Sequence, residues 1–302
     1  MSRFDSIDLS KLPPPEVIMT VDYEVLLAEM KAKAIELVPE LSEVLALESD
    51  PATKLLRVCA YYRMLDRLEF NDGARANMLA LATGTNLDGL GVLWGVERLV
   101  IEAADDTTVP ATAQVLEGDV AFRARIQLSL EGLSTAGPRG SYIFWALSAS
   151  GSVKDASVSS PAPGQVVVNI LSHEDNGTPS AALLDAVIAV LNDEDVRPLT
   201  DQVFVQPALI VPYTVEATLT LYSGPDTSTV EVASEAALVA YIDEHHRLGH
   251  DITLSGLYAA LHQPGVQNVT IAAPLADIVI GADQAAFCTS DALAISIGGR
   301  DV

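Results

Sequence analysis

One stretch of the sequence, which begins at Asp50-Pro51, predicts a helix too long for a small domain to cover. An acidic residue followed by proline is typical of a helix start, because the carboxylate caps free N–H groups and proline fits the first helical position. The apolar residues that follow at helical spacing are Leu55, Val58, Cys59, Tyr62, Met64, Leu65 and Leu68. If the helix runs to Ala82, it is about 48 Å long at 1.5 Å per residue. A helix of that length usually overhangs its own core.

The apolar side of this helix has two interpretations. The segment Tyr23–Val38 also has helical spacing and stops at Pro39, so the two helices alone form a hairpin in the simpler interpretation. In the other, the apolar side belongs to a bundle with helices from other chains, and the spacing alone leaves both interpretations open. Before them, the proline run Lys11–Pro15 indicates an extended segment, either a frayed terminus or an arm lying on a neighbouring subunit.

From about Asp119 the pattern changes to helices mixed with strands. We expect helices at 142–147, 180–191, 234–246 and 257–261, and strands at 165–171, 202–206 and 276–280. Val153–Pro161 and Val266–Pro274 share one residue spacing, a weak internal repeat that two small sheets, each with helices packed on one face, would explain; chance similarity of two hairpin units is the alternative. The sequence therefore predicts an α+β fold with small sheets covered by helices on one face. Its parts are an extended arm at 1–21, a helical bundle-forming region at 22–118, and α+β units at 119–207 and 208–302.

The charge balance excludes one class of partner. The 302 residues carry 17 Lys and Arg against 41 Asp and Glu, a net charge of −24. Because nucleic-acid binding depends on cations that neutralise phosphates, we expect this chain to bind neither nucleic acid nor an anionic membrane. The sequence also shows neither the ~18-residue apolar run of a membrane span nor a signal-peptide layout. We therefore expect synthesis in the cytoplasm, with Cys59 and Cys288 reduced and buried.

The strongest candidate for chemistry is a histidine pair near residue 250. His246 and His250 stand four residues apart, a spacing that lets two imidazoles share a zinc ion on one helix. A zinc peptidase needs a glutamate directly after the first histidine, where this chain has Arg247, and Gly249 interrupts the helix. We therefore expect no catalytic residue, no metal and no cofactor. The alternative is an acidic metal-dependent hydrolase that uses His246 and His250.

Two pairs of charged residues have local interpretations. Arg197 and Asp201 link the end of a helix to the strand at 202–206, and we interpret them as a structural latch rather than a catalytic pair. Arg123 and Arg125 lie on a helix that begins near Asp119. There they make either exposed ion pairs or a bridge to another subunit.

Several segments, taken in order, resemble one known family. The longest are residues 137–147, which read GPRGSYIFWAL, and residues 153–168, which read VKDASVSSPAPGQVVV. The others are 48–51 (ESDP), 86–98 (NLDGLGVLWGVER), 119–126 (DVAFRARI), 196–205 (VRPLTDQVFV) and 266–274 (VQNVTIAAP). From about Glu48 onward the chain closely resembles the baseplate J-like family, the wedge proteins of contractile phage tails and phage-tail-like bacteriocins.

The resemblance implies a structural protein that works through assembly and has no chemistry. It implies that J-like subunits pair around one copy of a neighbouring wedge protein, and that such wedges close a ring around the tail hub and couple it to sheath contraction. The implied partners are other copies of the chain, the neighbouring wedge protein, a lysozyme-like sheath-initiator protein and the hub. The implied location is the baseplate of a virion or tail-like particle. In the helix bundle of such a wedge we expect Leu55, Val58, Tyr62 and Leu65.

Overall fold

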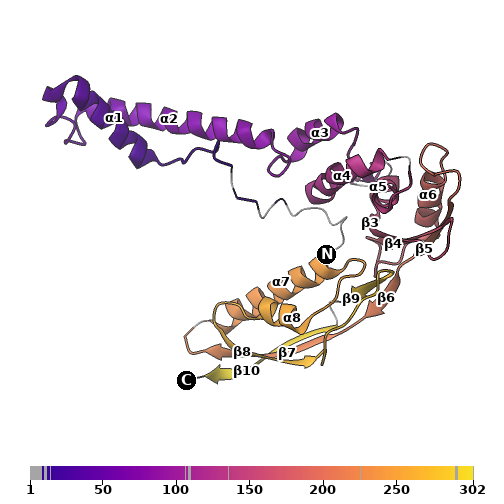
Figure 1. The fold of residues 1–302 in the computed structure, drawn as a ribbon. Helices are drawn as coiled ribbons and strands as arrows, with labels where there is room; N and C mark the ends of the chain where they lie inside the picture. The colour runs from indigo at the N-terminus through magenta and orange to yellow at the C-terminus, as the bar shows by residue number, and fades with distance from the viewer. Residues whose placement is uncertain are drawn as a thin grey trace. The chain divides into compact units, whose positions relative to one another are not determined.

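The computed structural model describes residues 9, 12–13, 15–105, 107, 110–134, 136–224, 226–289 and 292–301. They form two compact units. Unit 1 holds the residues up to Glu97 together with Asp119–Ile126, and unit 2 holds Arg98–Gly118 and the residues from Gln127 onward. Unit 1 is helical and unit 2 contains small sheets with helices, so the predicted α+β class is confirmed (Figure 1). None of the described helices is long and apolar enough to cross a membrane.

Unit 1 is built on two helices that lie side by side (Figure 1). They are α1 (Tyr23–Leu37) and α2 (Pro51–Ala76), joined through the short 3-10 helix η2 (Pro39–Leu41). The carboxylates of Asp22 and Asp50 cap their first turns by accepting backbone N–H groups. Their shared core is small and consists of buried Leu26, Leu27 and Ala60, with Tyr23, Met30, Leu56 and Met64 partly buried around it.

α2 ends at Ala76, so the prediction that it runs to Ala82 is wrong. Asn77 leaves the helical conformation with φ −95° and ψ 4°, and its side-chain amide donates to the carbonyl of Gly73 at 2.8 Å. This contact closes the last helical turn, and the residues that follow make short turns instead. With 26 residues, α2 is about 39 Å long.

The segment before α1 is held against α2 of its own chain. The Asn71 side chain, buried in α2, accepts the N–H of Met19 and donates to the carbonyl of Met19, both at 2.8 Å. Arg67 also donates to the carbonyl of Thr20 at 3.2 Å. This end of the predicted arm therefore lies on its own helix. The rest of the arm, including Lys11 and Pro14 of the proline run, falls largely outside the described residues.

The remaining elements of unit 1 are α3 (Gly84–Leu93) and the first part of α4 (Asp119–Gly132). Arg123 donates to the carbonyls of Leu79 and Ala82, each at 2.7 Å, and buried Arg125 donates to the carbonyl of Glu97 at 2.6 Å. Both guanidinium groups therefore bind free backbone carbonyls within unit 1. The sequence had offered exposed ion pairs or a bridge to another subunit.

The first sheet of unit 2 has the order β3-β4-β5. Its strands are β3 (Val153–Ser159), β4 (Gln165–Ser172) and β5 (Gln202–Pro207), and the helices packed on it are α5 (Arg139–Ala149) and α6 (Ala181–Leu191). β3 and β4 form an antiparallel hairpin, whose turn uses Gly164 at φ +75°, a backbone conformation that glycine adopts without strain. β5 runs parallel to β4, because the chain crosses over through α6 before it returns.

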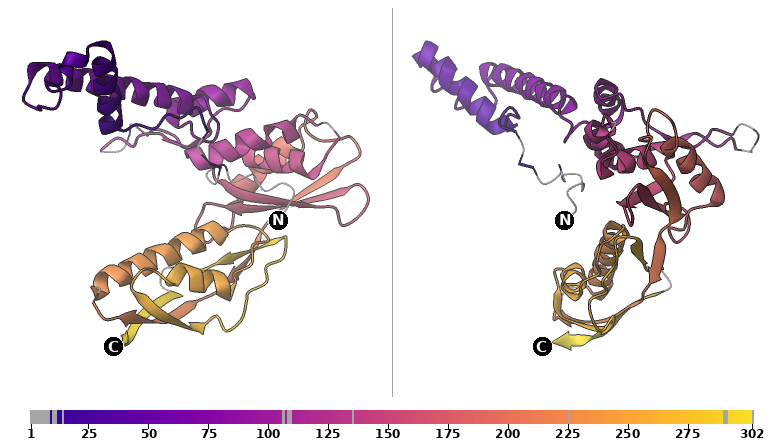
Figure 2. Two further views of the ribbon diagram at one scale, coloured as in Figure 1. Left: turned by 60° about the vertical axis from the view of Figure 1, so that its left-hand side comes forward. Right: turned by 45° about the vertical axis from the view of Figure 1, so that its right-hand side comes forward.

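The second three-stranded sheet has the order β10-β7-β8. Its strands are β7 (Val215–Tyr222), β8 (Val266–Ala273) and β10 (Leu293–Asp301). Figure 2 shows the helices α7 (Thr227–His245) and α8 (Leu254–Leu261) on one face of it, where they bury a large apolar core. Two smaller sheets pair β1 (Val100–Glu102) with β2 (Val115–Leu116), and β6 (Leu209–Pro212) with β9 (Gln284–Phe287).

The second copy of the weak repeat differs from the first in its strand pairing. Its strand β8 ends at Ala273 and pairs with the earlier β7, not with a strand that follows it. Residues 276–280 are no strand: only Ile278 makes a single bridge, to Ile252. The carboxylates of Asp277 and Asp251 hold this loop in place by accepting the backbone N–H groups of Leu254 and Ile280.

Candidate functional site

The predicted bundle residues form an exposed apolar seam on α2. The side chains of Leu55, Val58, Tyr62 and Leu65 are 67%, 52%, 62% and 37% exposed. They follow one another at alternating spacings of three and four residues, which keeps them on one side of a helix. We call these four residues the apolar seam. Cys59 lies next to it and is exposed, so the prediction that this cysteine is buried is wrong, while Cys288 is buried as expected.

The seam is exposed because α1 covers a different side of α2. Ala60 is fully buried against α1, and Leu56 and Met64 pack around it. These residues lie one helical turn apart on the side opposite the seam. Burying a leucine or tyrosine completely is worth roughly 1.5–3 kcal/mol, so the seam offers several kcal/mol to a helix that covers it. A partner would offset part of this through the entropy lost on association.

Arg197 and Asp201, the predicted latch, lie close together in unit 2. An Arg197 guanidinium nitrogen donates to the backbone carbonyl of Asp201 at 3.0 Å, and the Tyr142 hydroxyl donates to the Asp201 carboxylate at 2.8 Å. Burial raises the pKa of Tyr142, and the hydrogen bond to Asp201 raises it further, so this hydroxyl stays protonated. The contact joins α5 to the start of β5.

One position beside this contact has room only for glycine. Gly137 adopts φ +68°, and a Cβ there would lie 2.7 Å from Pro198 and 3.0 Å from the Asp201 carboxylate. Two of the sequence segments that resemble the family, residues 137–147 and 196–205, therefore meet at Asp201. Their residues pack and orient backbone, and the arrangement presents no exposed nucleophile beside a base.

The predicted zinc pair is not arranged as one helix would require. α7 ends at His245, so His246 and His250 do not share a helical face, which corrects the premise of the hydrolase alternative. The His250 ring instead faces His245, with ring centroids 6.2 Å apart. His246 is buried edge-on against Phe287 at 5.3 Å. Within the described part of the chain, no three His, Cys, Asp or Glu side chains come together to hold a metal.

His246 lines a small cavity of about 150 Å³ in unit 2. Lys154, His173, Asp243 and Cys288 also line it. Burial lowers the pKa of His246 to about 4, and the nearby Lys154 ammonium adds to this effect. Burial likewise lowers the pKa of His173. Near neutral pH both imidazoles are therefore uncharged, and His246 acts as a packing residue.

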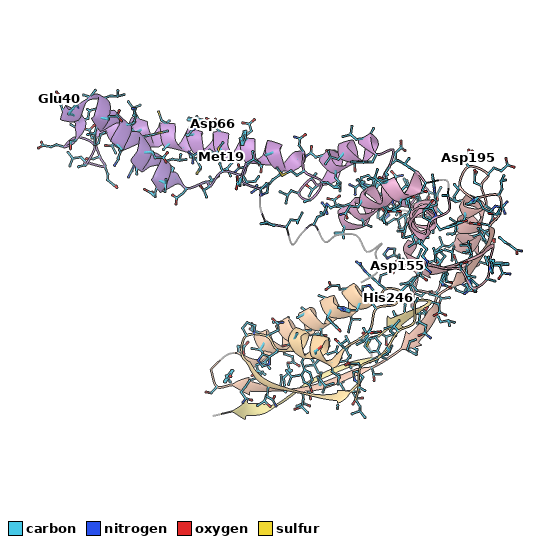
Figure 3. The ribbon with its side chains drawn as sticks, viewed as in Figure 1. Met19, Glu40, Asp66, Asp155, Asp195 and His246 are labelled. Atoms are coloured by element: carbon cyan, nitrogen blue, oxygen red, sulfur yellow. The ribbon has the colours of Figure 1, made fainter. Side chains whose placement is uncertain are left out.

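Sequence reasoning missed the role of a buried carboxylate in β3. The Asp155 side chain in β3 accepts the N–H of Leu248 at 2.9 Å and the N–H of Ala156 at 2.8 Å (Figure 3). Burial raises the pKa of Asp155, and the two backbone donors act in the opposite direction. The contact ties the loop after α7 to the first sheet of unit 2. Asp155 lies within the segment Val153–Pro161 of the weak repeat, but the sequence alone gave it no partner.

Three family models match the chain in order. They are the baseplate J-like N-terminal domain at residues 48–105, the baseplate J-like central domain at 134–207, and the baseplate J-like protein C-terminal domain at 213–290. Baseplate protein J of Escherichia phage P2 is 48% identical over 300 residues, which cover 98% of this chain and 99% of that protein.

A solved structure gives a weaker similarity. A chain in the cryo-EM structure of the anti-feeding prophage baseplate, 6-fold symmetrised, aligns with a TM-score of 0.37 at 15% identity. The alignment covers 65% of this chain and 47% of that one, less than half of its length. A similarity this low carries no weight for the function.

Proposed function

This chain belongs to the baseplate J-like family, and from that premise we propose that it is a wedge subunit of a contractile tail, which forms the ring around the tail hub and couples it to sheath contraction. It is a structural protein of the baseplate of a phage or phage-tail-like particle. The wedge role goes beyond that and is supported by the apolar seam of α2, whereas the coupling is what the family resemblance implies.

The observation that carries this proposal is the apolar seam of α2. Soluble monomers seldom leave several large apolar side chains exposed along one helix unless the surface binds a partner. The seam residues have the spacing of a helix bundle, and the side opposite is already occupied by α1. We therefore assign the seam to a bundle with helices of other subunits, namely other copies of this chain and the neighbouring wedge protein.

We assign the remaining contacts of the ring to the α+β regions. A ring that closes by rotation needs two different surfaces on each subunit. The α+β units at residues 153–206 and 210–302 are our candidates for these surfaces, and the hub and a lysozyme-like sheath-initiator protein are the further partners we propose. With a net charge of −24, free subunits repel one another at low salt, so ring closure waits for partners.

We propose further that the protein performs no chemistry. The Arg197, Asp201 and Tyr142 contact serves as a structural latch, since the Arg197 guanidinium donates to the Asp201 backbone carbonyl and the Tyr142 hydroxyl to the Asp201 carboxylate. We interpret His246 as a neutral packing residue rather than as a metal ligand paired with His250, and we therefore set the hydrolase alternative aside. Stoichiometric zinc in the purified protein that disappears in His246→Ala would overturn this part.

Co-expression with the other baseplate proteins of the same tail gene cluster tests the seam. We expect Tyr62→Asp and Leu65→Asp to abolish the complex, because each places a charge in a surface that must be dehydrated. Val120→Asp is the matched control, since Val120 is also exposed but lies in the first turn of α4, where an acid is tolerated. Native mass spectrometry should find more than one copy of this chain per complex. Normal complexes from both seam variants would reject the bundle.

A further inference from the structure

The seam of α2 continues beyond Leu65 into charged residues. The alternation of three and four residues that connects the apolar seam leads next to Glu69 and then to Asp72. Both side chains are exposed. The surface offered to a bundle is therefore apolar over its first turns and acidic in the turns that follow.

Glu69 is the acid of this surface that unit 1 leaves without a counterion. The carboxylate of Asp72 lies 3.2 Å from the Arg75 guanidinium, and the neighbouring Asp66 lies 3.9 Å from Arg63. Within the residues that the structure describes, Glu69 makes no ion pair and no side-chain hydrogen bond. Its charge is thus available to whatever helix covers the seam.

The position of this charge decides which helices fit. A charged residue at a seam position loses water when a second helix packs over it, and that loss must be offset by an opposite charge. Two copies of this chain in parallel bring one Glu69 against the other, and like charges at facing positions are destabilising. A single polar residue in such a seam is known to fix partner and oligomeric state at the expense of stability.

We propose that a helix from a different kind of chain joins the bundle at the seam and places a lysine or arginine opposite Glu69. Glu69 then also keeps two copies of this chain from pairing along the seam until that helix arrives. The inference rests on the proposed bundle and adds the chemistry of its partner. Charge complementarity carries it, because the unpaired acid follows directly on the apolar residues, in a chain with a net charge of −24.

An antiparallel pair of copies is the competing occupant. Lys54, one residue before the seam, is exposed, and an antiparallel neighbour would bring it near an acid at the other end. Such a pair would need no second kind of chain, and it would form in the isolated protein. The state of the isolated protein therefore separates the two possibilities.

Sedimentation equilibrium of the isolated full-length chain at low salt is the first test. We expect the wild type to be monomeric at micromolar concentration and Glu69→Leu to dimerise at least tenfold more tightly, because leucine extends the apolar seam. Glu40→Leu makes the same exchange at an exposed position outside α2 and should behave as the wild type. A wild-type dimer, or a Glu69→Leu chain as monomeric as Glu40→Leu, would overturn the inference.

Co-expression with the other baseplate proteins of the tail gene cluster is the second test. Glu69→Lys should reduce recovery of the mixed complex at least tenfold, while Glu40→Lys should leave it unchanged. If Tyr62→Asp abolishes the complex but Glu69→Lys does not, the seam is an interface and only the inference about a cation fails. If neither variant affects the complex, the proposed bundle itself fails, and the two failures are thereby distinguishable.

Discussion

The helix pair α1–α2 and the sheet β10-β7-β8 show two different ways of using apolar side chains. The sheet buries its own: Val215, Leu219 and Leu221 in β7 are fully covered by α7 and α8. The helix pair buries only Leu26, Leu27 and Ala60 and leaves the seam in solvent. The sheet region therefore has what it needs to fold alone, whereas α2 keeps part of its stabilising surface for another chain.

The largest expected effect on stability comes from a substitution in the core of the sheet region. Leu219 is fully buried in the middle strand, so Leu219→Ala should lower the free energy of unfolding by about 2–5 kcal/mol. Glu216→Ala, at an exposed position of the same strand, is the control and should change stability little. Urea denaturation followed by circular dichroism measures both. Equal stability of the two variants would contradict the idea of a self-sufficient core.

The next effect concerns the segment on α2. Asn71→Ala removes both hydrogen bonds to Met19 and leaves the Met19 backbone groups to water, at a local loss of about 1–3 kcal/mol. Hydrogen exchange at the Met19 amide should speed up accordingly, while amides of β7 keep their protection. An unchanged exchange rate at Met19 would show that the segment is held by other contacts.

A third effect is a pH dependence of unit 2. The pKa of His246 is about 4 in the folded chain and near 6.5 when unfolded, so the unfolded chain binds the proton first. Stability should therefore fall by about 1–2 kcal/mol as the pH drops from 6.5 to 4, a value reduced for partial solvation. The raised pKa of Asp155 acts oppositely, because there the folded chain binds the proton first.

His246→Gln should flatten this pH profile, since glutamine does not titrate. Thermal unfolding at several pH values, compared between the wild type and His246→Gln, checks it. Identical slopes in the two proteins would assign the acid sensitivity to other groups.

The smallest expected effect on stability concerns the exposed side of α2. Leu55→Ala and Leu56→Ala change neighbouring leucines of α2, of which only Leu56 packs on α1. We expect Leu55→Ala to alter the unfolding free energy by less than about 0.5 kcal/mol but to weaken the baseplate complex. Leu56→Ala should do the reverse, with a loss of roughly 1–3 kcal/mol. Denaturation and co-purification, measured on both variants, separate folding from assembly.

The sequence predicted best where a local rule decides the outcome. The start of α2 at Asp50-Pro51 follows from capping and from the fixed backbone angle of proline, and it was confirmed. The end of α2 was missed because Asn77 is compatible with several conformations until its side chain finds the Gly73 carbonyl. The pairing of β8 with β7 was missed because strand partners depend on tertiary contacts rather than on spacing.

For the candidate site, too, the local patterns were predicted and the tertiary contacts were not. Helical spacing selected Leu55, Val58, Tyr62 and Leu65, although it did not distinguish a side covered by α1 from one left exposed. It also placed His246 in a helix that ends one residue earlier. The roles of Asp155 and Tyr142 depend on neighbours distant in the chain, and no pattern in the sequence names such neighbours.

The parallel pairing of β10 with β7 determines when this sheet can be completed during synthesis of the chain. β7 is synthesised long before β10, yet it is the middle strand and has β8 on one side and β10 on the other. Until residues 293–301 have emerged, one edge of β7 has no strand beside it, and an open edge is prone to pair with other chains. Truncated chains that lack β10 would therefore keep an unpaired strand edge on β7. The quality-control machinery of the cell could recognise such chains by this edge.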